Sequence, residues 1–247
     1  MLTTQYRMNE VIMKFPSQEL YDNELVAADS VKDRVLTDLS YSTLNSDMGK
    51  LSLDDGPTTG KVEETEETKY PLIFYDTQGG DFPEDEDKAL SDAESKLKPL
   101  LGSDSKSNTY EAMIARSHIL SLIEAGVKAS DIAVITPYNA QVAALAAILR
   151  DDERTADVEI GSVDGFQGRE KEAVLVTLVR SNEKGEVGFL GEKRRLNVAM
   201  TRPKRQLCVI GDSDTIQKGS PFLKRWMEFL EANADLRYPD VGEHMPS

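Results

Sequence analysis

The chain has 247 residues, a formal net charge of −15, and 39% hydrophobic residues. This length and apolar content suffice for a substantial core in one large or two small domains. No apolar run approaches the roughly 20 residues of a membrane-spanning helix, and no signal peptide is recognisable, so we expect a soluble protein of the cytoplasm or nucleus without a membrane partner. A single cysteine, Cys208, excludes an intrachain disulfide, and no Cys or His spacing predicts a zinc site.

The negative charge is concentrated in one part of the chain. Residues 46–107 carry 16 acidic and 7 basic side chains, whereas residues 161–211 carry 10 basic and 6 acidic ones. Because salt screens charges beyond about 10 Å at cellular ionic strength, the local balance decides what a surface binds. The overall charge therefore does not exclude a nucleic-acid partner for residues 161–211.

The first 40 residues are expected to form an N-terminal helical segment. Apolar residues within residues 8–25 flank Pro16 on both sides, which predicts two short helices rather than one. Residues 41–70 and 79–107 are rich in Ser, Asp, Glu, Gly and Thr, so residues 41–107 are interpreted as acidic, flexible insertions. Within this segment, the apolar run at residues 70–76 predicts one strand.

From residue 108 onward, helix and strand patterns alternate regularly. The strands are apolar on both faces, as in a parallel sheet covered by helices on both sides. We therefore expect an α/β core at residues 108–235 and a tail at residues 236–247, all in one domain. The expected helices lie at residues 112–123, 139–150, 194–201 and 221–232, and the expected strands at residues 131–136, 158–163, 173–179 and 206–210.

Four motifs stand out against this pattern. Each alone has a plain structural interpretation, because glycine-rich turns make tight connections and arginines on a helix usually face solvent. Together, however, they supply glycines, a carboxylate and several arginines, which are the groups of a phosphate site. The motifs are Gln-Tyr-Arg-Met at residues 5–8, Thr-Pro-Tyr-Asn-Ala-Gln at 136–141, Gly-Ser-Val-Asp-Gly-Phe-Gln-Gly-Arg-Glu at 161–170, and Arg-Arg-Leu-Asn-Val-Ala-Met-Thr-Arg at 194–202.

In this order the motifs resemble the C-terminal motor domain of superfamily 1 helicases of the Upf and DNA2 kind, and within them the mu-binding protein 2 group. Specific similarity covers residues 2–25 and 108–212, although Asn9 and Glu10 stand where the family usually has His and Pro. The resemblance implies a RecA-like domain of the P-loop NTPase type, the second of two motor domains, without a phosphate-binding loop of its own. Residues 56–62 match such a loop poorly in glycine spacing and in the residue that follows Lys61.

The resemblance assigns ATP contacts to both ends of the chain. Arg7 and Arg202 would reach the γ-phosphate, Arg202 as the arginine finger, and Glu170 would lie near the ribose and γ-phosphate; these three are the expected catalytic residues. ATP with Mg²⁺ would bind in a cleft shared with a first RecA-like domain of the same polypeptide, so no metal ligand is expected in this chain. The expected nucleotide-binding residues are Gln5, Tyr6, which would stack on the adenine, Arg7, Gly168, Glu170 and Arg202.

The resemblance also implies that single-stranded DNA or RNA crosses the ends of the strands of the sheet. Hydroxyl, amide and backbone N–H groups there would contact phosphate and sugar without reading the base sequence. The expected contacts are Thr136, Pro137, Tyr138, Ser162, Val163, Asp164, Arg180, Ser181 and Asn182.

The sequence thus predicts the second motor domain of an ATP-dependent 5′-to-3′ DNA or RNA helicase, unable to hydrolyse ATP efficiently without its first domain. The alternative is a noncatalytic RecA-like module that binds nucleic acid or a helicase partner. A third hypothesis is a small-molecule enzyme of doubly wound fold, for which the sequence offers no nucleophile and base pair, metal cluster or dinucleotide fingerprint.

Overall fold

The computed structural model describes residues 3–42, 59–85 and 105–240. Its centre is a six-stranded sheet in the order β10-β5-β9-β8-β6-β7, in which every neighbouring pair is parallel. The strands are β5 (Leu72–Asp76), β6 (Ile132–Thr136), β7 (Glu159–Ser162), β8 (Lys171–Thr177), β9 (Pro203–Gly211) and β10 (Asp235–Arg237). The predicted α/β class with a parallel sheet is confirmed.

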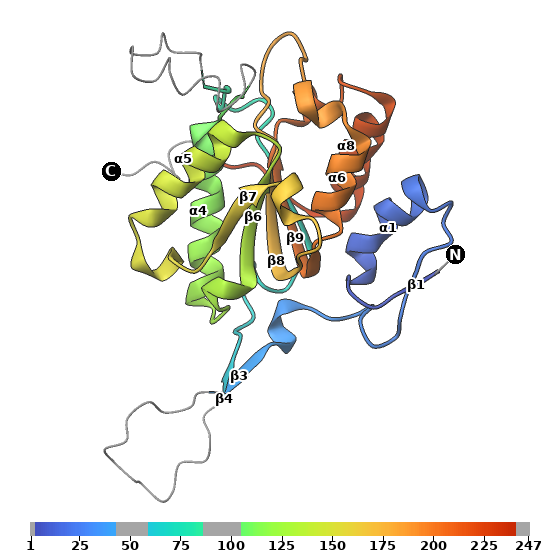
Figure 1. The fold of residues 1–247 in the computed structure, drawn as a ribbon, viewed down its shortest axis with the longest axis vertical. Coiled ribbons are helices and arrows are strands. Elements are labelled where there is room, and N and C mark those ends of the chain that lie inside the picture. Colours follow the sequence, from blue (N-terminus) through green and yellow to red (C-terminus); the bar gives the residue numbers. More distant parts are fainter. Residues whose placement is uncertain (1–2, 43–58, 86–104, 241–247) are drawn as a thin grey trace, which may run out of the picture.

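Helices cover both faces of this sheet (Figure 1). One face packs against α4 (Thr109–Glu124) and α5 (Asn139–Arg150). The opposite face packs against α1 (Glu10–Leu20), α6 (Lys193–Met200) and α8 (Pro221–Asn233), with the short α7 (Ser213–Ile216) before α8.

The alternation of side chains along each strand produces two separate hydrophobic cores. In β5, Ile73 and Tyr75 point toward α4 and α5, whereas Leu72 and Phe74 pack on the side of α1 and α8. Because every second side chain faces the same side of a sheet, a central strand needs apolar residues at all positions to fill both cores. This requirement explains the uninterrupted apolar runs in the sequence.

Helix α1 differs from the prediction of two short helices, because it continues through Pro16. Proline removes one helical N–H donor and disfavours a continuous helix. Here the neighbouring turn is held by packing: the ring of Phe15 lies 5.5 Å from that of Phe222 and 5.3 Å from that of Phe229 on α8. Tertiary contacts therefore override the local preference of Pro16, which is itself buried.

Two small two-stranded sheets flank the core. Strand β1 (Thr4–Gln5) pairs in parallel with β2 (Val26–Ala27), and β3 (Ser40–Ser42) pairs antiparallel with β4 (Thr59–Lys61). Most of the segment interpreted as flexible insertions, residues 43–58 and 86–104, lies outside the described residues, so that interpretation stays a prediction. The described parts of it form β4, β5 and the turns beside them.

Structure also extends two residues into the predicted tail. Strand β10 pairs with β5, and the Arg237 side chain donates hydrogen bonds to Tyr75 Oη (3.0 Å) and Asp235 (2.7 Å). On the same side of the sheet as Tyr75, His118 is buried, within hydrogen-bonding distance of Tyr75 Oη (3.3 Å) and Gln206 Oε1 (3.1 Å). His118 is therefore part of the core rather than of a binding site.

Candidate functional site

The predicted site residues lie at two opposite edges of the sheet. All strands of a parallel sheet begin at one edge and end at the other, so they define an amino edge and a carboxyl edge. Glu170 and Arg202 directly precede β8 and β9 and lie at the amino edge. The residues expected to contact nucleic acid follow β6, β7 and β8 and lie at the carboxyl edge: 136–138, 162–164 and 180–182.

At the amino edge, Gln5 shapes the turn that carries the Gln-Tyr-Arg-Met motif. Its side-chain oxygen accepts hydrogen bonds from the backbone N–H groups of Arg7 (2.7 Å) and Met8 (2.8 Å), and its amide nitrogen donates to the Met8 carbonyl (2.8 Å). Both ends of the Gln5 amide are therefore engaged within the turn. This leaves Tyr6 at the tip, where it is 72% exposed.

Arg7 brings the N-terminal motif to the other two expected catalytic residues. Its Nε donates to Glu170 Oε2 (2.6 Å), and one terminal nitrogen donates to the Thr201 carbonyl (3.1 Å), next to Arg202. Arg202 donates to the carbonyls of Val198 (2.9 Å) and Arg169 (3.1 Å). The structure thus gathers Arg7, Glu170 and Arg202, which are up to 195 positions apart in the sequence.

The amino edge carries more positive than negative charge. Glu170 also pairs with Lys204 Nζ (3.2 Å), which in turn pairs with Glu172 (3.1 Å), while Arg202 has no carboxylate partner among its described contacts. Partial burial opposes ionisation of Glu170, but the hydrogen bonds from Arg7 and Lys204 outweigh it and hold the pKa of the carboxyl below its usual range. Burial, followed by the nearby charge of Arg7, lowers the pKa of Arg202, although a guanidinium stays charged at cellular pH.

At Gly168 the surface of the amino edge is not covered by other atoms. Its φ of +87° lies in the left-handed region, which side chains rarely adopt, and a Cβ built there would meet no atom within 4 Å. The glycine is thus required by the backbone turn and leaves the surface beside it uncovered. Gly161, by contrast, has the ring of Phe166 packed against it, at 2.8 Å from a built Cβ.

At the carboxyl edge, most predicted contact residues are buried or already engaged. Thr136, Tyr138 and Val163 are at most 1% exposed, and the Tyr138 hydroxyl donates to the Val187 carbonyl (2.8 Å). Pro137 and Ser162 are half-buried and Asp164 is exposed, although Asp164 faces Arg195 on α6 at 3.4 Å.

The loop after β8 is the most tightly bound part of this edge. Arg180 pairs with Glu84, with its Nε 2.8 Å from Oε2, and the two side chains are only 7% and 14% exposed. The Ser181 hydroxyl donates to Asp212 (2.8 Å), and the Asn182 side chain bonds both backbone groups of Glu186 (2.9 and 3.0 Å). These side chains therefore stabilise the loop itself.

Val179, just before this loop, has a strained backbone. Its φ is +73°, an outlier for a β-branched residue. Its N–H donates to both oxygens of Glu111 on α4 (3.0 and 2.9 Å), and Glu111 is fully buried. Burial raises the pKa of Glu111 well above its usual range. A buried carboxyl group thus fixes the direction in which the chain leaves β8.

The sequence analysis missed two residues that complete these edges. Lys204 stands two positions after Arg202, so the alternation along a strand could have placed both on one side. Glu84 carries no comparable signal, because it lies in an acidic run and its partner Arg180 is 96 positions away.

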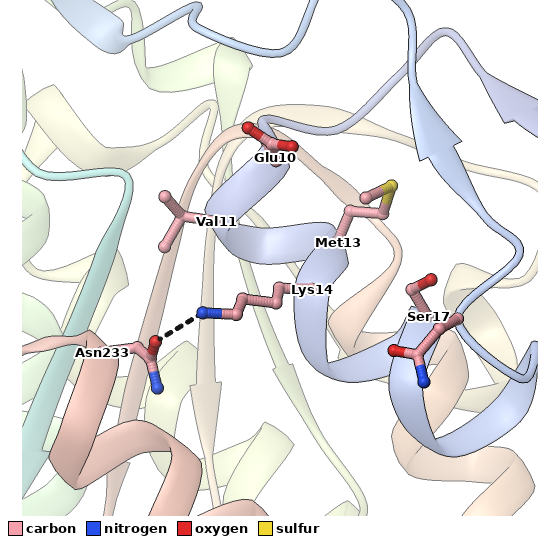
Figure 2. A pocket seen from close by; sticks show the side chains of 7 residues that line it. Glu10, Val11, Met13, Lys14, Ser17 and Asn233 are labelled. Atoms are coloured by element: carbon pink, nitrogen blue, oxygen red, sulfur yellow. Dashed lines mark hydrogen bonds between the residues drawn. The ribbon is translucent and has the colours of Figure 1, made fainter.

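A cavity of about 430 Å³ lies beside α1 and the end of α8 (Figure 2). Its wall includes Lys14, whose ammonium group donates to Asn233 at the end of α8 (3.2 Å), and none of the predicted site residues lines it. Within residues 3–42, 59–85 and 105–240, no cluster of His, Cys, Asp or Glu could hold a metal ion. In the same residues, no helix is long and apolar enough to cross a membrane.

Comparison of the chain with known proteins identifies the family to which it belongs. A family model described as an AAA domain matches residues 1–214. The DNA polymerase alpha-associated DNA helicase A of Schizosaccharomyces pombe is 51% identical over 233 residues, which are 94% of this chain and 31% of that protein. Its namesake in Saccharomyces cerevisiae is 45% identical over 245 residues, 99% of this chain and 32% of that protein.

A mammalian relative shows the same relation. DNA-binding protein SMUBP-2 of Rattus norvegicus is 41% identical over 237 residues, which are 96% of this chain and 20% of that protein. The chain therefore spans a third or less of the length of these relatives. It belongs to the AAA-domain family of superfamily 1 helicases, in the group of DNA helicase A and SMUBP-2.

Proposed function

We propose that this chain is the second motor domain of an ATP-dependent helicase that moves 5′ to 3′ along single-stranded DNA or RNA. The observation that carries the proposal is the meeting of Arg7, Glu170 and Arg202 at the amino edge of the sheet. Arg7 comes from the N-terminal segment, and Arg202 comes from the turn between α6 and β9. Both are accessible, since Arg7 is about a third exposed and Arg202 is half-buried.

The residues at this edge fit a nucleotide phosphate. Guanidinium groups bind phosphate oxygens in a planar fork and remain charged at cellular pH. Glu170 shares its charge between Arg7 and Lys204, so an incoming phosphate can draw Arg7 away without leaving Glu170 unpaired. The exposed ring of Tyr6 offers a flat surface for an adenine.

ATP supplies the phosphoryl group whose transfer to water drives a motor domain, and its γ-phosphate would meet Arg7 and Arg202. Transfer also requires a cradle for the phosphates and a carboxylate-held Mg²⁺. Because no cluster that could hold a metal appears in the described residues, we propose that a first RecA-like domain of the same polypeptide provides both. The length of the relatives, about three times that of this chain or more, leaves room for such a domain.

The carboxyl edge is the proposed surface for the nucleic-acid strand. Backbone groups and short polar side chains at strand ends contact phosphate and sugar rather than base edges, so binding would not depend on the base sequence. Pro137, Ser162 and Asn182, which are partly exposed, lie along this edge at or after the ends of β6, β7 and β8, which are neighbours in the order β7-β6-β8. Arg180 is the one cation in the set.

The test compares ATP hydrolysis by the 247-residue chain with hydrolysis by a joined protein, in which a first motor domain with a phosphate-binding loop precedes this chain. We expect no turnover above background by the chain alone, with or without oligothymidylate. The joined protein should hydrolyse ATP and be stimulated by the strand. Turnover by the chain alone, or a joined protein that folds but shows neither turnover nor strand binding, would overturn the proposal.

A further inference from the structure

Glu84 fills the position in which Arg180 would hold a nucleic-acid phosphate. Its carboxylate accepts hydrogen bonds from Arg180 Nε (2.8 Å) and one terminal guanidinium nitrogen (3.3 Å), from the Ser181 backbone N–H (3.2 Å) and from the Asn182 amide (3.0 Å). One anionic group thus receives four N–H donors from three consecutive residues. Such a set of donors forms an anion site, and here the anion comes from the chain itself.

A carboxylate and a phosphodiester are interchangeable in such a site, because each presents two oxygens that share a negative charge to the guanidinium fork. We propose that Glu84 is an internal competitor of the nucleic-acid strand: its carboxylate occupies the Arg180 site in the free protein and leaves when a phosphate of the strand binds. This inference rests on the proposed function, since it takes the carboxyl edge as the surface that contacts the strand.

The segment around Glu84 is built so that the side chain can move while the backbone stays. On one side, Asn108 Nδ2 donates to the Phe82 carbonyl (3.1 Å). On the other, the Asp85 carboxylate accepts from the Thr109 hydroxyl (3.0 Å), at the start of α4. With Phe82 and Asp85 anchored and the Glu84 N–H bound to the Ser181 carbonyl (3.2 Å), release of Arg180 requires only rotation of the Glu84 side chain.

The guanidinium of Arg180 is held from other directions as well. A Cβ built on Gly188 would lie 2.8 Å from a terminal nitrogen of Arg180 and 3.0 Å from the Tyr138 hydroxyl, so this glycine and the ring of Tyr138 lie close around the guanidinium. Burial lowers the pKa of Arg180, but the hydrogen bonds that its guanidinium makes to Glu84 and Tyr138 outweigh burial and raise that pKa. When Glu84 leaves, Arg180 stays positioned and faces only the more distant, exposed carboxylate of Glu186 among its described ion pairs (3.9 Å), so a phosphate can take the place of Glu84.

The functional consequence is a lowered affinity for the strand. When the competent state is only a fraction of the population, the apparent dissociation constant rises in inverse proportion to that fraction. The substitution Glu84→Gln removes the negative charge but keeps the size of the side chain, so it weakens the internal competitor. The strand should then bind more tightly.

The experiment measures binding of fluorescein-labelled oligothymidylate to the 247-residue chain by fluorescence anisotropy at low salt. We expect Glu84→Gln to bind roughly three- to tenfold more tightly than the unaltered chain. Glu183→Gln is the matched control, because it removes the same charge from an exposed residue of the loop after β8, and it should stay within about twofold. The gain should disappear in Glu84→Gln combined with Arg180→Ala, and thermal unfolding establishes that each variant is folded.

The outcomes separate this inference from the proposed function. If the unaltered chain binds the strand and Glu84→Gln binds equally or more weakly, Arg180 and Glu84 are a permanent structural pair and the inference fails while the function stands. If neither binds, the inference fails together with the assignment of the strand to the carboxyl edge, whereas the remainder of the proposed function is tested by the joined protein. Should Glu84→Gln not fold, the carboxylate carbon of Glu84 can be followed by NMR in the unaltered chain: its signal should shift on addition of the strand, and an unchanged signal with bound strand would overturn the inference.

Discussion

Each edge of the sheet has an ion pair between an arginine and a glutamate, but the two pairs differ in their exposure to solvent. At the amino edge, Arg7 and Glu170 are 35% and 42% exposed, whereas at the carboxyl edge Arg180 and Glu84 are 7% and 14% exposed. An exposed pair contributes about 1 kcal/mol or less and exchanges partners easily. A buried pair cannot lose one member without a replacement for its charge. The amino edge is therefore open to an anion, and the carboxyl edge must first release its own.

One short loop connects the two edges. It leaves β7 after Ser162 at the carboxyl edge and reaches Glu170, just before β8, at the amino edge. Along the way, Asp164 faces Arg195 on α6 (3.4 Å), and Arg202, after the end of the same helix, donates to the Arg169 carbonyl (3.1 Å). The loop and α6 thus touch at both edges.

The largest expected effect distinguishes the arginine finger from its neighbours. In the joined protein, Arg202→Ala should lower kcat for ATP at saturating strand by on the order of 10² or more, because the guanidinium neutralises charge that develops in the transition state. Arg194→Ala, an exposed position on the preceding helix α6, should keep a kcat within about twofold of the unaltered protein. Steady-state kinetics of both variants measures the difference. Equal losses for both would mean that the whole helix, rather than Arg202, supports turnover.

The second effect concerns stability at the carboxyl edge. Glu111→Ala should unfold with a free energy about 2 kcal/mol lower than that of Glu111→Gln, because only glutamine still offers an acceptor to the buried Val179 N–H. Urea unfolding followed by circular dichroism measures both variants. Identical stabilities would show that the strained turn at Val179 does not need the acceptor.

The same pair of measurements has a pH dependence of definite sign. Burial raises the pKa of Glu111 well above its usual value of 4.5. At a pH between the pKa of the unfolded chain and the raised pKa of the folded chain, the native state therefore holds more protons than the unfolded state. Unfolding of the unaltered chain therefore becomes easier as pH rises through this window. Glu111→Gln carries no such proton, so its stability relative to the unaltered chain should grow from pH 5 to pH 7. A constant difference would contradict the assignment.

A smaller effect tests the tip of the N-terminal turn. Tyr6→Ala should raise the KM for ATP in the joined protein by about tenfold, since an aromatic ring stacked on a base contributes roughly 1 to 3 kcal/mol. Strand affinity and unfolding should not change, because Tyr6 is 72% exposed. Tyr238→Ala, which removes another exposed tyrosine at 63%, is the control. An unchanged KM for Tyr6→Ala would remove the adenine contact from the proposal.

The sequence predicted the core well where the signal was local. Apolar runs marked the positions of β5, β6, β7, β8 and β9, and periodicity marked α4, α5, α6 and α8, because each must fill a core from its own residues. The continuous helix through Pro16 could not be predicted, since its support comes from Phe222 and Phe229 on a distant helix. The three-residue strand β10 is too short and too polar to show a pattern.

In the candidate site, too, some features could be predicted from the sequence and others could not. The meeting of Arg7 with Glu170 followed from the resemblance of two motifs, and the structure places them 2.6 Å apart. Burial of Arg180 could not be anticipated, because its partner Glu84 lies in a segment that composition alone describes as acidic and featureless. Exposure and pairing depend on the whole fold. A motif therefore predicts which groups are present better than it predicts whether they are free.

The central claim is that the amino edge binds the nucleotide and the carboxyl edge binds the strand. It is tested most directly by measuring strand affinity across a salt series in the joined protein for Arg180→Ala and Arg202→Ala. A cation that holds a phosphate releases about one counterion, so Arg180→Ala should weaken binding and reduce the slope of log affinity against log salt by roughly one. Arg202→Ala should leave both the slope and the affinity close to those of the unaltered protein. If Arg202→Ala abolishes strand binding, or if Arg180→Ala leaves the slope unchanged, the assignment of nucleotide to the amino edge and strand to the carboxyl edge is wrong.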